Sequence, residues 1–138
     1  MSRRADAALA ALCVVARLHR VAAEPEALRH QLGLGPSQAP STDDLLLAAK
    51  HLGLKAKLST TRLERLKLAA LPALALLRDG RVVVLAQCDG QRVLFQDMAA
   101  DGTRPTIEPL DVFAVQWTGR LVVVASRASL AGELAKFD

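Results

Sequence analysis

The stretch from Leu71 to Val93, LPALALLRDGRVVVLAQCDGQRV, constrains the fold of this chain more than any other. Two Asp-Gly pairs, Asp79-Gly80 and Asp89-Gly90, separate runs that are rich in leucine and valine. Because an Asp-Gly pair suits the tight turn of a β-hairpin, the pattern predicts three consecutive antiparallel strands. The middle run, Val82 to Ala86, is apolar at every position, which is typical of a strand covered on both faces.

Outside this stretch, apolar side chains recur with helical spacing near the N-terminus and alternate just before residue 60. The helical spacing predicts helices at 5–19, 24–32 and 41–52, the last opened by a capping box that begins at Ser41. The alternation predicts a half-buried strand at 54–58. Later elements are a helical turn at 62–66, strands at 91–96 and 121–125, and a short helix at 109–114. Three helices followed by about five strands predict an α+β fold, with the N-terminal helices packed on an antiparallel sheet.

The composition narrows the range of possible partners. A chain of 138 residues with 51% hydrophobic and 23% charged residues is typical of one globular domain. Its net charge of +4 and pI of about 9.6 suit an anionic partner, either nucleic acid, an anionic membrane surface or an acidic polypeptide. Aromatic residues make up only 3% of the chain, so the stacking platform of a single-strand nucleic-acid binder is missing. No apolar run reaches the length of a membrane span.

Cysteines and histidines are few and widely separated. Cys13 and Cys88 provide no disulfide framework, which favours a reducing, cytoplasmic setting. Cys13 lies within the apolar first helix, so we expect a buried and unreactive thiol there. His19, His30 and His51 lie at or near helix ends, too far apart in sequence for a local metal site. No histidine follows residue 51.

Four segments of the chain, together with its tail, resemble a known family. They are residues 16–34 (ARLHRVAAEPEALRHQLGL), 45–58 (LLLAAKHLGLKAKL), 71–81 (LPALALLRDGR) and 121–127 (LVVVASR). At matching spacing they are similar to the N-terminal cytosolic domain of haemolysin B-type ABC transporters, which belong to type I secretion systems. The tail at 130–138, LAGELAKFD, resembles the linker before the first membrane helix of those transporters. The resemblance implies a papain-like fold over residues 1–127 and a linker over 128–138 that leads to a transmembrane domain outside this chain.

The related peptidase domains of bacteriocin exporters use a cysteine nucleophile, a histidine base and an aspartate that orients the base. The resemblance places these positions at Ala7, Val82 and Asp97, and residues 1–6 offer no counterpart for the oxyanion-hole glutamine. Only the aspartate is retained. Because no histidine follows residue 51, the Cys–His dyad cannot form in the order of this family, and we expect a catalytically inactive domain.

The resemblance also implies a role and a set of partners. Such domains hold an unfolded secretion substrate at the transporter during export, and the typical substrate is acidic, with calcium-binding repeats of the RTX type. The partners implied are this substrate, the rest of the transporter and the membrane fusion protein of the secretion complex. We expect a monomeric domain on the cytoplasmic side of the bacterial inner membrane, with no cofactor or metal of its own and no nucleic-acid partner. ATP and Mg²⁺ would bind the nucleotide-binding domain, which is absent from this chain.

Two surfaces are candidates for substrate binding. The first is a basic strip in which several cations follow one another with only Glu64 opposing them, and its members are Lys55, Lys57, Arg62, Arg65 and Lys67. An extended acidic chain could add to the strand there, although lysines on an edge strand also serve simply as solvated charges that prevent aggregation. The second is the former catalytic cleft, lined by Leu76, Val82 and Asp97 and made more apolar by the loss of cysteine and histidine.

The alternatives are an enzyme and a nucleic-acid binder. An active cysteine protease that cleaves a leader peptide would have to use Cys13 or Cys88 with His19 or His30, an order that the family does not use. A basic nucleic-acid-binding domain would explain the pI, but no recognition motif supports it. Cleavage of a double-glycine leader would favour the first alternative, and strongly salt-dependent binding of random duplex the second.

Overall fold

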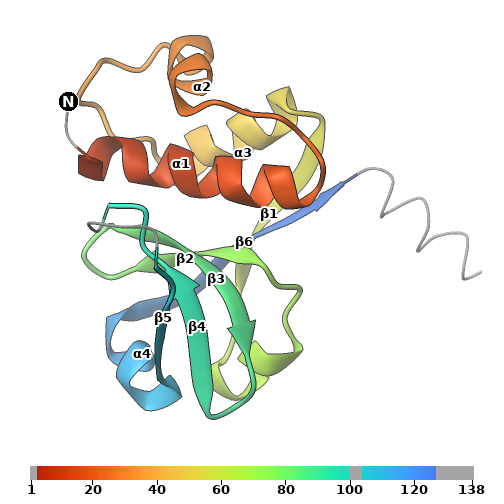
Figure 1. Ribbon diagram of the computed structural model, residues 1–138, viewed down its shortest axis with the longest axis vertical. Coiled ribbons are helices and arrows are strands. Elements are labelled where there is room, and N and C mark those ends of the chain that lie inside the picture. Colours follow the sequence, from red (N-terminus) through yellow and green to blue (C-terminus); the bar gives the residue numbers. More distant parts are fainter. Residues whose placement is uncertain (1–2, 100–103, 127–138) are drawn as a thin grey trace, which may run out of the picture.

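The computed structural model describes residues 3–99 and 104–126 and places three helices on one side of a six-stranded sheet (Figure 1). The helices are α1 (Arg3–Leu18), α2 (Pro25–Leu32) and α3 (Thr42–His51). Gly33 ends α2 with a φ of +70°, which a glycine adopts without strain. Ser41 caps α3, since its Oγ accepts a hydrogen bond from the Asp44 N–H at 3.1 Å and its own N–H donates to the Asp44 carboxylate at 2.9 Å. The predicted helices and the capping box are therefore confirmed.

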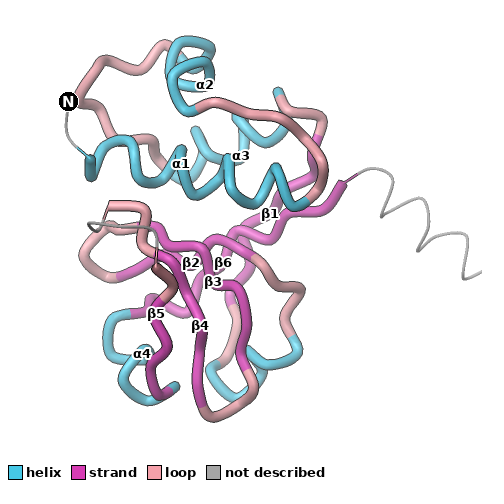
Figure 2. Tube along the Cα trace, viewed as in Figure 1, coloured by secondary structure: helices cyan, strands magenta, loops and turns pink. Residues whose placement is uncertain are grey.

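The sheet is antiparallel throughout, with the strand order β1-β6-β2-β3-β4-β5. Its strands are β1 (Leu54–Thr60), β2 (Ala73–Leu77), β3 (Val82–Cys88), β4 (Arg92–Gln96), β5 (Thr106–Pro109) and β6 (Trp117–Ser126). A short 3₁₀-helix, η1 (Leu63–Leu68), follows β1, and α4 (Leu110–Gln116) joins β5 to β6. Figure 2 shows the layers, with α1 to α3 on one side of the strands and α4 on the other. The two Asp-Gly turns connect β2 to β3 and β3 to β4, as predicted.

Alternation along the two central strands divides their side chains between two cores. The even-numbered residues face the helices and the odd-numbered residues face away from them. The first set is Leu74, Leu76, Val82 and Val84, and the second is Ala73, Ala75, Leu77, Val83 and Leu85. Both sets are buried, so the prediction of a strand covered on both faces is correct for β3.

In the described residues, the core between the helices and the sheet contains aliphatic side chains, a cysteine and a methionine but no aromatic ring. α1 crosses the sheet near β2 and β3 and supplies most of the helical side of this core (Figure 1). Its large members are Leu9, Leu12 and Val15, and alanines fill the positions between them. These small side chains allow the helix backbone to lie close to the strands.

Arg29 of α2 ties the helical layer together. Its side chain is only 6% exposed, and its Nη2 donates to the Asp6 carboxylate of α1 at 2.8 Å. Its Nη1 donates to the carbonyl oxygens of Gly35 and Gln38 at 2.6 and 2.7 Å. One buried guanidinium therefore joins α1, α2 and the loop that leads to α3.

The opposite face of the sheet carries the aromatic core. The ring centroids of Phe95 and Phe113 lie 5.4 Å apart, and those of Phe113 and Trp117 lie 6.0 Å apart. Phe113, on α4, is fully buried between the other two. The Trp117 Nε1–H donates to the carbonyl of Arg120 at 3.0 Å, so the indole has a polar partner. Leu66 of η1 packs into the same cluster.

An extra residue interrupts the pairing of β3 with β4. Leu85 pairs with Phe95, but Gln87 rather than Ala86 pairs with Leu94, which defines a β-bulge. Beyond it, Cys88 packs against the aromatic core while Gln87 is exposed.

The sheet has six strands, where the sequence predicts about five. The additional strand is β5, in a segment that the sequence presents as a connection. Three of its four residues are exposed, so it shows no buried alternation that would reveal a strand. The linker predicted at 128–138 lies outside the described residues. None of the helices in the described part of the chain combines the length and the apolar character needed to cross a membrane.

Candidate functional site

The three positions that the resemblance assigns to catalysis come from α1, β3 and the end of β4. Val82 is the first residue of β3, buried beside its cross-strand partner Leu76 on β2. Ala7 is buried on α1, the helix that packs over β3. Asp97 directly follows β4. Since neither alanine nor valine carries a group that can act as nucleophile or base, only Asp97 retains any polar chemistry.

Both carboxylate oxygens of Asp97 are engaged. Its Oδ2 accepts a hydrogen bond from Nη1 of Arg81 at 2.7 Å, and its Oδ1 accepts one from the N–H of Ala99 at 2.9 Å. The Asp97 side chain is 14% exposed, so this ion pair is largely shielded from water. The aspartate that would orient a base is therefore paired with a guanidinium.

Arg81, one residue before the base position, is the centre of a wider polar network. Its Nε donates to Asp79 at 2.7 Å, and its Nη2 donates to the side chain of Gln116 at 3.1 Å. Gln116 in turn donates to Glu108 at 2.7 Å. Partial burial lowers the pKa of Arg81, but the hydrogen bonds and charges of Asp79 and Asp97 outweigh it and leave the pKa above its usual value. Arg81 therefore stays charged and cannot replace the missing base.

A hollow of about 280 Å³ lies between the N-terminus of α3 and the β2–β3 turn. Leu76 and Val82 line it together with Leu45, and Arg81 and Arg120 add positive charge to its wall. Neither Ala7 nor Asp97 is among its lining residues. The structure thus brings two of the three predicted cleft residues into one hollow and leaves Asp97 outside it.

The basic strip predicted from the sequence occupies β1 and η1. Lys55 and Lys57 lie on β1, Arg62 directly precedes η1, and Arg65 and Lys67 lie within it. All five side chains are exposed. In the part of the chain that the structure describes, none of the five pairs with a carboxylate. These charges are therefore available to an acidic partner.

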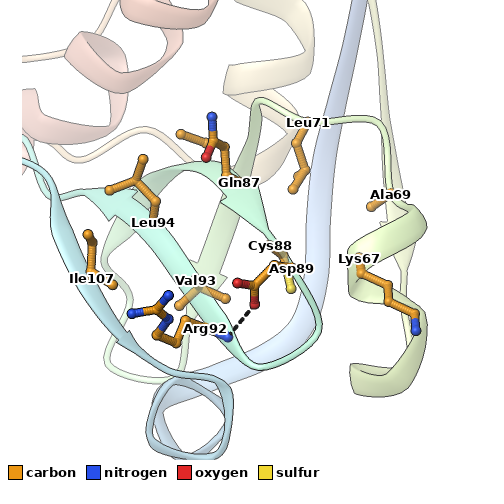
Figure 3. A pocket seen from close by; sticks show the side chains of 11 residues that line it. Lys67, Ala69, Leu71, Gln87, Cys88, Asp89, Arg92, Val93, Leu94 and Ile107 are labelled. Atoms are coloured by element: carbon orange, nitrogen blue, oxygen red, sulfur yellow. Dashed lines mark hydrogen bonds between the residues drawn. The ribbon is translucent and has the colours of Figure 1, made fainter.

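A larger hollow, about 470 Å³, lies between the η1 segment and the β3–β4 hairpin (Figure 3). Cys88 is half-buried at its wall, with Lys67 contributed by η1 and Arg92 by β4. Hydrogen bonds from the N–H groups of Arg92 and Gln91 lower the pKa of the neighbouring Asp89 carboxyl. None of the described residues that line this hollow is a histidine, so they supply no imidazole to activate the Cys88 thiol.

Cys13 is buried in the helix-facing core, as expected. Burial raises the pKa of its thiol from 9.0 to about 11, with the Arg17 charge acting in the opposite sense. The thiol is therefore protonated and unreactive near neutral pH. In the described ranges, no group of three or more His, Cys, Asp or Glu side chains could hold a metal ion.

Sequence reasoning missed two arginines that organise the molecule. Arg81 directly follows the Asp79-Gly80 turn, which explains its contact with Asp79, but its partner Asp97 lies 16 residues further along the chain, just after β4. Arg29 follows Leu28 and precedes Leu32 on α2, so a charge beside the apolar stripe of a helix was the available signal. Neither the partners nor the burial of these side chains can be read from local spacing.

Comparison with known proteins places this geometry in a family. Residues 2–129 match the model of the peptidase C39 family. The toxin RTX-I translocation ATP-binding protein of Actinobacillus pleuropneumoniae is 38% identical over 136 residues, which are 99% of this chain and 19% of that protein. The chain thus spans about a fifth of the length of this curated relative.

Solved structures show the same architecture. The N-terminal peptidase C39-like domain of the toxin secretion ATP-binding protein from Vibrio parahaemolyticus has a TM-score of 0.75 and 30% identity, covering 88% of this chain and 98% of that one. A double glycine motif protease from an AMS/PCAT transporter, in complex with the leader peptide, has a TM-score of 0.74 and 23% identity, covering 86% and 83%. The predicted α+β fold of the papain-like peptidases is confirmed.

Proposed function

The chain belongs to the peptidase C39 family, and from this membership we propose that it is a non-catalytic domain that binds an unfolded polypeptide for export. In this proposal the domain tethers the polypeptide at a transporter and leaves its peptide bonds intact. The observation that carries the proposal is the state of Asp97. Its two oxygens are taken by Arg81 and by the backbone of Ala99, while positions 7 and 82 offer only methyl groups.

The loss of catalysis follows from the chemistry of these groups. Cysteine proteases need a thiolate, which is a minor species near neutral pH until a base activates it. The chain has no histidine beyond His51, and Arg81 holds its proton. Cys13 is buried and protonated, and Cys88 lies in a hollow without a histidine among its described lining residues.

The binding role is supported by the relatives and by two surfaces. A relative that matches nearly the whole chain is named as a toxin RTX-I translocation protein. The Leu45, Leu76 and Val82 side of the smaller hollow suits an apolar side chain of an extended polypeptide, and the basic strip suits its carboxylates. We place the domain on the cytoplasmic side of the inner membrane, where the transporter, its membrane fusion protein and an unfolded RTX-type cargo would meet. ATP and Mg²⁺ belong in this scheme to a separate nucleotide-binding domain.

The test is an NMR titration of the 138-residue chain with a repeat segment of its cargo, once unfolded without calcium and once folded with calcium. We expect shifts with the unfolded segment and affinity at least about tenfold weaker for the folded one, because only an extended chain can present its backbone and side chains together. The absence of shifts with either form would contradict the binding role.

A cleavage assay tests the other half of the proposal. The chain should leave a double-glycine leader peptide intact, and the cysteine-free variant C13A/C88A should bind the unfolded segment as the parent chain does. Cleavage by the parent chain that disappears in C13A/C88A would establish a cysteine protease and refute the proposal.

A further inference from the structure

The two edges of the sheet differ in their capacity to accept another strand. β5 forms one edge and has four residues, of which Pro109 lacks an N–H, and the Glu108 side chain is held by Gln116. β1 forms the other edge, and its seven residues pair with β6 in one unbroken register. β1 contains no proline. Regular, proline-free backbone is what strand addition requires, so β1 is the receptive edge.

The direction of the free backbone groups on β1 follows from its contact with β6. The N–H of Thr61 donates to the carbonyl of Gly119 at 2.7 Å, which fixes the phase of the ladder. In an antiparallel pair, alternate residues direct both backbone groups toward the partner strand. Odd-numbered residues therefore face β6, and the N–H and C=O groups of Leu54, Ala56 and Leu58 point to the open edge. No strand in the described sheet pairs with them.

The side chains of β1 give this edge a definite charge. Leu54, Ala56 and Leu58 pack toward the helices, so Lys55 and Lys57 project from the opposite face, where both are exposed. η1 lies on that same face, since its Leu66 is part of the aromatic core. The exposed Arg62 and Arg65 therefore extend the positive charge of the edge beyond the end of β1.

We propose that an extended acidic segment of the exported polypeptide adds to β1 as a seventh strand, with carboxylates at alternate positions opposite Lys55 and Lys57. This inference rests on the proposed function and names the surface and the chemistry that it uses. Backbone hydrogen bonds would tolerate varied sequences, and the lysines would select acidic ones. The same lysines repel the β1 edge of a second copy, so the edge resists self-association while accepting an acidic strand.

The experiment measures binding of a capped acidic peptide of about nine residues, alternating Glu with Thr, to the 138-residue chain. The variant Ala56→Pro removes one outward N–H and leaves the pairing with β6 intact, because residue 56 faces the open edge. We expect Ala56→Pro and the double reversal K55E/K57E each to weaken binding about tenfold or more. The matched variant R92E/R104E makes the same change in net charge as K55E/K57E, but near β4 and β5. Its affinity for the peptide should stay within about twofold of that of the parent chain.

Backbone methylation of the peptide tests the geometry without altering the protein. Methyl groups on one alternate set of peptide nitrogens should abolish binding, and the same number on the other set should not, because only one set faces β1. Equal binding of both methylated peptides would overturn the inference. If the unfolded cargo binds the parent chain and Ala56→Pro equally well, the inference fails while the proposed function stands. If neither cargo nor peptide binds the parent chain, both fail.

Discussion

The two faces of the sheet are packed in different ways. The helix-facing core is built from alanine, leucine and valine, while the described aromatic residues, Phe95, Phe113 and Trp117, all lie on the other face. A core of small aliphatic side chains tolerates replacement by similar ones, whereas a row of stacked rings depends on each member. Positions 7 and 82 lie in α1 and β3, on the helix-facing side of the sheet, where the core is aliphatic. Alanine and valine at these positions are the residue types from which that core is already made.

This difference explains how the scaffold can be kept with alanine at position 7 and valine at position 82. The aromatic rings hold α4 against the sheet through contacts that involve neither position 7 nor position 82. Arg81 supplies a partner for Asp97, so the retained carboxylate is not left buried and unpaired. The fold therefore does not require a catalytic dyad for its stability.

Removal of the central ring is the strongest test of the difference between the faces. Phe113→Ala should lower the free energy of unfolding by about 3–5 kcal/mol, because a fully buried ring leaves a cavity between two others. Chemical denaturation monitored by the fluorescence of the single tryptophan would measure it. Val115→Ala, at a 77% exposed position of the same helix, should change stability by less than about 0.5 kcal/mol. A loss below about 1 kcal/mol for Phe113→Ala would show that the aromatic row is not rigidly packed.

The helical layer has its own critical residue. Arg29→Ala should cost about 3 kcal/mol, since it leaves Asp6 and two carbonyl groups without their buried partner. Arg17→Ala removes an exposed ion pair to Glu24 at 3.9 Å and should cost less than about 1 kcal/mol. Thermal and urea denaturation of the two variants would compare them. Equal costs would mean that burial of the guanidinium does not matter.

The smallest expected effect concerns Cys13 in the aliphatic core. Burial raises the pKa of this thiol from 9.0 to about 11, so the folded state retains its proton more tightly than the unfolded state. The resulting stability is fully present below pH 9 and is lost as the pH rises toward 11. Between pH 8 and pH 11, the urea concentration at the midpoint of unfolding should therefore fall more steeply with pH for the parent chain than for Cys13→Ala. Parallel curves for the two proteins would contradict this expectation.

The sequence predicted the elements that carry local signals. The capping box at Ser41 and the two Asp-Gly turns each encode a backbone geometry within a few residues, and each is confirmed. β5 was missed because its residues are mostly exposed. Its place in the sheet depends on β4, a pairing between distant residues that no local period records.

In the candidate site, too, some contacts were predicted from the sequence and others were not. The predicted cleft comprised Leu76, Val82 and Asp97. Leu76 and Val82 line one hollow, because they are cross-strand partners on either side of a predicted turn, but Asp97 is not among its lining residues. The pairing of Arg81 with Asp97 joins the residue before β3 to the residue after β4 and was not predicted. Its existence depends on the register of β3 against β4. The register of β3 against β4 includes a bulge that no local sequence pattern predicts.

The bulge at Ala86 limits where the length of β3 can change. The extra residue decides that Cys88 faces the aromatic core and that Gln87 faces water. If Ala86 instead paired with Leu94 in a regular ladder, Gln87 would face the apolar cluster, whereas loss of Ala86 alone would leave Cys88 facing the core. A change in the length of β3 should therefore be tolerated best at the bulge, because a deletion elsewhere along the strand would turn the following side chains to the wrong face.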